Sequence, residues 1–125
     1  MAALVSAHVV VAEDEPMIGR ILEHKLAREG HRVTWVRDCA ALQASLRQGD
    51  VDVALVDATL DRDGLELMAS VAGTPRCGWL AMVEQRNPGA QRRAAEAGAA
   101  GVVLKPFKPT AVAALVLDLL ERAAV

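Results

Sequence analysis

The sequence predicts a doubly wound α/β fold, in which a five-stranded parallel sheet is covered by helices on both faces. Short runs rich in Val, Leu and Ala alternate along the chain with stretches whose apolar residues recur at helical spacing. Helix-length segments between successive strands require crossover connections, and these favour parallel pairing. The length of 125 residues and the apolar fraction of 53% suit one domain with a substantial core.

Five apolar runs favour β-strands. They are residues 8–12, 32–36, 51–57, 77–83 and 101–104. The second run alternates polar and apolar residues, which is typical of a half-buried strand at a sheet edge. We therefore expect the strand order 2-1-3-4-5 of a flavodoxin-like three-layer sandwich. In such sheets, ligands bind outside the carboxyl ends of the strands.

Five segments between and after the strands favour helices. Four of them open on a proline or an N-cap residue, at Pro16, Asp38, Asn87-Pro88 and Lys108-Pro109. The remaining helix follows a loop that runs through Gly64. Three helices are followed by glycines that suit a helix end, namely Gly30, Gly49 and Gly98. The alternation of strand and helix is therefore continuous along the chain.

The composition excludes several classes of partner. The 14 basic and 16 acidic residues give a net charge of -2 and form no basic stripe, which argues against nucleic-acid binding. The apolar stretches are far shorter than the roughly 20 residues of a membrane span, and residues 1–7 lack the charged start of a signal peptide. Cys39 and Cys77 have no metal-binding spacing. We expect a cytoplasmic protein with two reduced thiols and no membrane contact.

Charged side chains follow three of the predicted strands. Glu13 and Asp14 follow the first strand, Asp57 closes the third, and Lys105 follows the fifth. The carboxyl ends of parallel strands meet at one edge of the sheet, and clustered carboxylates there favour a hard divalent cation. We expect Mg²⁺ bound by Asp14, Asp57 and the Thr59 carbonyl, with Glu13 acting through water.

The same cluster predicts phosphoryl chemistry. Asp57 would place one carboxylate oxygen on the metal and keep the other for attack on a phosphoryl group. Lys105 would supply positive charge to the phosphoryl oxygens. We therefore assign the reacting roles to Asp57 and Lys105.

Together these motifs resemble the receiver domain of bacterial two-component response regulators. The resemblance spans residues 1–125 as one receiver-like domain, and it rests on Val11–Pro16, Leu55–Asp57 with Gly64, Gly98-Ala99 and Lys105–Phe107. It implies that a sensor histidine kinase or phosphotransfer protein phosphorylates Asp57, and that Lys105-Pro106 is a cis peptide. It also implies a signalling domain and not an enzyme, with a downstream protein partner, no DNA binding by this domain, and a homodimer through the helix after Pro88, the strand 101–104 and the last helix.

Several positions depart from the family pattern. The Ser or Thr expected at the end of the fourth strand is Val83, which has no hydroxyl, and the next residue is Glu84. The aromatic position three residues before Lys105 is Val102. The loop after Asp57 lacks a proline and is one residue short. The acceptor chemistry is therefore intact, whereas the usual switch residues are atypical.

Three alternatives remain beside the phosphoryl acceptor. The first is a degenerate receiver that acts as a phosphorylation-independent docking module, which Val83, Glu84, Val102 and the shortened loop favour. The second is an aspartate-nucleophile phosphohydrolase, but its general acid would stand at Thr59, which has no carboxyl group. The third is a flavodoxin-like cofactor binder, but no phosphate-cradling loop follows the first strand.

Overall fold

A five-stranded parallel sheet forms the centre of the protein. The computed structural model describes residues 6–71 and 73–124. The strands are β1 (His8–Ala12), β2 (Arg32–Val36), β3 (Val53–Asp57), β4 (Trp79–Glu84) and β5 (Gly101–Lys105). They pair in the order β2-β1-β3-β4-β5, and every pairing is parallel. The predicted fold class and strand order are confirmed.

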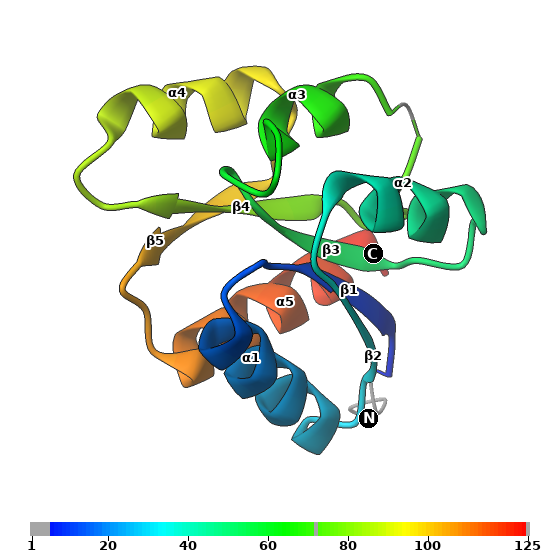
Figure 1. Cartoon of the computed structure of the whole chain (residues 1–125). Coiled ribbons are helices and arrows are strands. Elements are labelled where there is room, and N and C mark those ends of the chain that lie inside the picture. Colours follow the sequence, from blue (N-terminus) through cyan, green and yellow to red (C-terminus); the bar gives the residue numbers. More distant parts are fainter. Residues whose placement is uncertain (1–5, 72, 125) are drawn as a thin grey trace.

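Helices cover both faces of the sheet, as Figure 1 shows. They are α1 (Pro16–Arg28), α2 (Cys39–Arg47), α3 (Gly64–Ala69), α4 (Pro88–Glu96) and α5 (Pro109–Ala123). Helices α1 and α5 pack on one face, and α2, α3 and α4 pack on the other. Each face therefore has its own apolar core, built mainly from Val, Leu and Ala. No helix in the described ranges combines the length and the apolar character needed to cross a bilayer.

Local capping explains where most helices begin. The side chain of Asp38 accepts from the Ala41 N–H at 2.8 Å, and Asn87 caps α4 at 3.0 Å, as the sequence predicts. Glu15 caps α1 by accepting from the Met17 N–H at 3.3 Å. Pro16 follows it in the first turn, where a missing N–H costs nothing.

Two strands are shorter at their start than the apolar runs predict. The run from residue 51 enters the ladder at Val53, and the run from residue 77 enters it at Trp79. Gly78 has φ +107, a left-handed conformation that interrupts the extended chain immediately before β4. The sequence prediction of a strand from residue 77 was wrong for this backbone reason. At its other end, β4 continues through Glu84.

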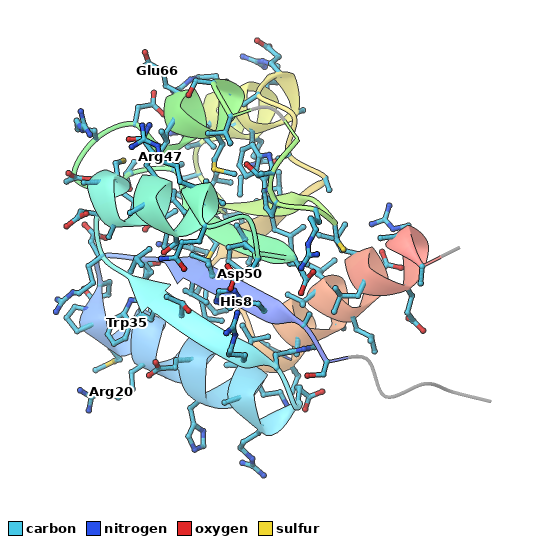
Figure 2. All side chains as sticks on the ribbon, turned by 90° about the vertical axis from the view of Figure 1, so that its right-hand side faces the viewer. His8, Arg20, Trp35, Arg47, Asp50 and Glu66 are labelled. Atoms are coloured by element: carbon cyan, nitrogen blue, oxygen red, sulfur yellow. The ribbon has the colours of Figure 1, made fainter. Side chains whose placement is uncertain are left out.

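The amino-terminal end of the sheet is closed by polar contacts. His8 lies in β1 and is buried, with Nε2 2.7 Å from Thr34 Oγ1 and Nδ1 3.5 Å from Asp50 Oδ1. Figure 2 shows His8 beside Asp50 at this end. The His8 N–H also donates to Asp52 Oδ2 at 2.8 Å. These contacts hold β1, β2 and the segment before β3 together, at the end opposite the predicted site.

Candidate functional site

Parallel register brings the predicted acidic residues to one edge of the sheet. Ala12, the last residue of β1, pairs with Val56, so that Glu13 lies beside Asp57 at the end of β3. One carboxylate oxygen from each of Glu13, Asp14 and Asp57 lies within 4.8 Å of the others. Glu13 is fully buried and Asp57 is 4% exposed, whereas Asp14 faces solvent. The cluster is therefore buried on one side and open on the other.

Lys105 joins two of these carboxylates. It is the last residue of β5, and its Nζ lies 2.8 Å from Glu13 Oε1 and 2.7 Å from Asp57 Oδ2. Only 12% of the lysine side chain is exposed, so solvent screens the two ion pairs weakly. The structure thus brings Lys105 to the place that the sequence predicts. The Lys105-Pro106 peptide bond is cis, as the resemblance implies.

Thr59 holds the other oxygen of Asp57. Its main-chain N–H donates to Asp57 Oδ1 at 2.9 Å, and its hydroxyl donates to the same oxygen at 3.2 Å. Sequence reasoning placed Thr59 at the site for its carbonyl and missed this hydroxyl contact. A Ser or Thr two residues after a strand-end Asp is the signal that would have suggested it, because such turns form locally. The carbonyl ligand stays a prediction.

Burial and charge shift the pKa values of the three linked groups. Burial, with the neighbouring Asp57, raises the pKa of Glu13 from 4.5 to about 7. Burial also acts to raise the pKa of Asp57, but hydrogen bonding by Glu13 and Lys105 outweighs it and lowers that pKa. The pKa of Lys105 is raised, because its contacts with Asp57 and Glu13 outweigh its burial. Near neutral pH, Asp57 is therefore ionised and faces an ammonium.

The donor set fits a magnesium ion. Mg²⁺ prefers carboxylate, carbonyl and water oxygens, and it tolerates sites that supply only one or two carboxylates. Glu13, Asp14 and Asp57 supply three carboxylates, against which Lys105 supplies one positive charge. A divalent cation would balance the excess negative charge, and the exposed side of the cluster leaves room for water ligands.

The residues at the atypical positions border the same site. Val83 is 2% exposed near the end of β4, where it pairs with Leu104. Glu84 is exposed and pairs with Lys105 across the ladder. A space of about 30 Å³ beside Asp57 is lined by residues that include Val83, Glu84 and Lys105. The two positions that the sequence analysis marks as atypical thus place an apolar side chain and a carboxylate beside Asp57.

Side-chain contacts fix the loop after Asp57. Asp61 accepts from the Cys39 N–H at the start of α2, at 2.8 Å. Asp63 caps α3 and forms an ion pair with Arg93 of α4. The position of Asp63 directly before Gly64 is itself a helix-start signal. The shortened loop is thus attached to two helices.

Gly64 is required by the close approach of the chain to the site. A Cβ at this position would lie 2.5 Å from the main-chain oxygen of Asp57, which is closer than a Cβ atom can approach a carbonyl oxygen. The φ of Gly64 is not in the left-handed region, so its requirement is one of space. The glycine lets the start of α3 pack directly on the residue that carries the carboxylate.

The chain is similar to known receiver domains. Residues 9–117 match the family model described as the response regulator receiver domain. An uncharacterised transcriptional regulatory protein of Bacillus subtilis (strain 168), YbdJ, is 34% identical over 64 residues, which are 50% of this chain and 28% of the relative. The chain therefore matches little more than a quarter of that protein's length.

Solved receiver domains share the fold. The receiver domain of TorR, the response regulator of a TMAO respiratory system, is 27% identical with a TM-score of 0.86, over 94% of this chain and 98% of that one. The receiver domain of NtrX from Brucella abortus is 23% identical with a TM-score of 0.81, over 91% and 98%. This chain covers 28% of the longer NtrX structure. Since the family model spans most of its residues, this chain belongs to the response regulator receiver domain family.

Proposed function

We propose that this domain accepts a phosphoryl group on Asp57 in two-component signalling. The observation that carries the proposal is the contact of Lys105 Nζ with both Asp57 and Glu13 beside a third carboxylate, Asp14. Such an arrangement supplies an ionised nucleophile, a fixed positive charge and oxygen ligands within one small volume. Membership in the receiver family supports the same conclusion.

The residues divide the chemistry between them. An oxygen of Asp57 attacks the phosphorus of a phosphohistidine, the new P–O bond forms as the P–N bond breaks, and the imidazole leaves. Lys105 stays beside Asp57 and neutralises charge on the phosphoryl oxygens. Asp14, Asp57 and the Thr59 carbonyl would hold Mg²⁺, with Glu13 acting through water. When bound, the ion supplies additional positive charge to the transferring group.

The partners follow from the family and are part of the proposal. A sensor histidine kinase or phosphotransfer protein would supply the phosphoryl group, and a downstream protein would read its presence. A homodimer would use the face of α4, β5 and α5, on which Leu104, Leu115 and Leu117 are each more than a third exposed. We place these events in the cytoplasm, where such kinases present their phosphohistidine.

Intact-mass measurement tests the proposal. The protein is incubated with MgCl₂ and a small phosphodonor such as acetyl phosphate, and wild type should gain the mass of one phosphoryl group. Asp57→Asn should gain none. Asp118→Asn is the matched control, because Asp118 is exposed on α5 and pairs with Arg122 away from the site. An unmodified wild type, or equal modification of Asp57→Asn, would contradict the proposal.

The docking module that acts without phosphorylation is the main alternative. None of the comparisons favours it, and the acidic site keeps its three carboxylates and its lysine. Its support comes from Val83, Glu84, Val102 and the shortened loop after Asp57. It predicts that a captured partner binds wild type and Asp57→Asn equally, with or without phosphodonor.

A further inference from the structure

The edge strand β2 contacts the main chain of the acidic turn. The indole Nε1–H of Trp35 donates to the carbonyl oxygen of Glu13 at 2.9 Å. On the other side of the same residue, the Glu13 N–H donates to the carbonyl oxygen of Val36 at 3.0 Å. Both main-chain polar groups of Glu13 are therefore bound by β2, one through the backbone and one through a side chain.

The indole ring is itself held in place. Gly19 of α1 lies so close that a Cβ there would stand 2.1 Å from Trp35 Cε2 and 2.3 Å from Nε1. The guanidinium of Arg37 lies 5.6 Å from the ring centroid, within the range of a cation–π interaction. Figure 2 shows Trp35 at the edge of the sheet beside α1. The ring therefore has little freedom to turn away from Glu13.

Glu13 in turn arranges the residues that follow it. Its Oε2 accepts from the Glu15 N–H at 3.0 Å, and its Oε1 accepts from Lys105 Nζ at 2.8 Å. Asp14 lies between Glu13 and Glu15, which the first of these hydrogen bonds joins, and its side chain is exposed to solvent. A change in the position of the Glu13 main chain would move the carboxylates of Glu13 and Asp14 relative to Asp57, and metal binding depends on their separation.

We propose that Trp35 is a positioning residue for the acidic turn of residues 13–15, and that its indole N–H strengthens Mg²⁺ binding there. The inference rests on the proposed function for the identity of the ion. The ring touches neither the ion nor the phosphoryl group, so its effect passes through the Glu13 carbonyl. A purely structural role would affect unfolding and leave the affinity for Mg²⁺ unchanged.

The test compares two equivalent substitutions by calorimetric titration with MgCl₂. Trp35→Phe keeps an aromatic ring and removes the N–H, so the dissociation constant for Mg²⁺ should rise about threefold to tenfold, the value of one hydrogen bond. Trp79→Phe makes the same chemical change at the start of β4, where the ring lies on the other face of the sheet, and should leave that constant unchanged. Thermal unfolding of both variants measures their loss of stability, so that it can be separated from a loss of Mg²⁺ affinity.

A second measurement needs no substitution at Trp35. In ¹⁵N-labelled wild type, Mg²⁺ should shift the indole N–H resonance of Trp35 and leave that of Trp79 in place. Equal Mg²⁺ affinities of wild type and a folded Trp35→Phe, or an unmoved Trp35 resonance, would overturn this inference while the proposed function stands. A wild type that binds no Mg²⁺ would contradict the metal site and this inference together.

Discussion

Lys105 Nζ lies 2.7 Å from Asp57 Oδ2, although the two residues are 48 positions apart in the chain. They close the ends of β5 and β3, which are separated by β4 in the sheet. The lysine therefore reaches across a whole strand to meet the aspartate, and it meets Glu13 from β1 at the same time. One ammonium connects three of the five strand ends.

Removal of this ammonium should destabilise the protein unless a metal replaces it. Lys105→Met leaves two carboxylates buried together, so we expect the free energy of unfolding to fall by about 3 kcal/mol in EDTA. Mg²⁺ should restore part of that loss, and should stabilise the variant more than wild type. Urea unfolding with and without MgCl₂ measures both effects. Lys108→Met, an exposed position at the start of α5, should change little. Equal losses from both variants would contradict the expectation.

The raised pKa of Glu13 predicts that rising pH lowers the stability of the metal-free protein and strengthens the binding of Mg²⁺. Because its pKa is 4.5 unfolded and about 7 folded, the folded protein binds the proton more tightly. The stability from this group is complete below pH 4.5 and is lost as pH rises through 7. Mg²⁺ competes with the same proton, so its binding should strengthen over the same window. The lowered pKa of Asp57 acts at more acidic pH.

Glu13→Gln isolates this effect. In EDTA, the free energy of unfolding of wild type should decline between pH 5 and 7.5, whereas that of Glu13→Gln should be nearly flat. Glu15→Gln is the control, because that side chain is exposed and caps α1. A decline of equal size in all three proteins would assign the pH dependence to other groups.

A hydroxyl at position 83 should restore a response to phosphorylation. Val83 is buried beside Asp57, so Val83→Thr buries a hydroxyl and should cost about 1 kcal/mol in the unmodified protein. A phosphoryl group on Asp57 would accept a hydrogen bond from that hydroxyl, so the loss of stability should be smaller in the phosphorylated protein. Thermal unfolding with and without phosphodonor measures the difference. Val103→Thr, buried on the α1–α5 face, should cost as much and show no such recovery.

The contact between Gly19 and Trp35 predicts that Gly19→Ala changes stability in opposite directions in wild type and in Trp35→Leu. Alanine normally stabilises a helix relative to glycine by roughly 1 kcal/mol, but Gly19→Ala would place a methyl inside the indole ring and should destabilise wild type. In a Trp35→Leu background the ring is gone, so the same change should stabilise. Gly89→Ala in α4 meets only an ordinary contact and should not depend on Trp35. Independent, additive effects at positions 19 and 35 would refute the contact.

The sheet and the location of the site could be predicted because both follow from local patterns. Apolar runs define strands, and parallel strands deliver Glu13, Asp57 and Lys105 to one edge whatever the details of packing. The contact of Trp35 with Gly19 could not be predicted from the sequence, because it depends on the angle at which α1 crosses β2. The start of β4 was misplaced because the left-handed conformation of Gly78 interrupts the apolar run that precedes it.

The chain has 2 tryptophans and no tyrosine, and the two indoles lie on different strands and on opposite faces of the sheet. Trp35 is partly exposed and bound to the acidic turn, while Trp79 is 5% exposed in the core on the face that α2, α3 and α4 cover. Each variant with a single tryptophan is therefore an intrinsic fluorescent probe of one face of the sheet. Emission from Trp35 would report events at the carboxylates, and emission from Trp79 would report loosening of the core, so that ligand binding and unfolding can be followed separately without an added dye.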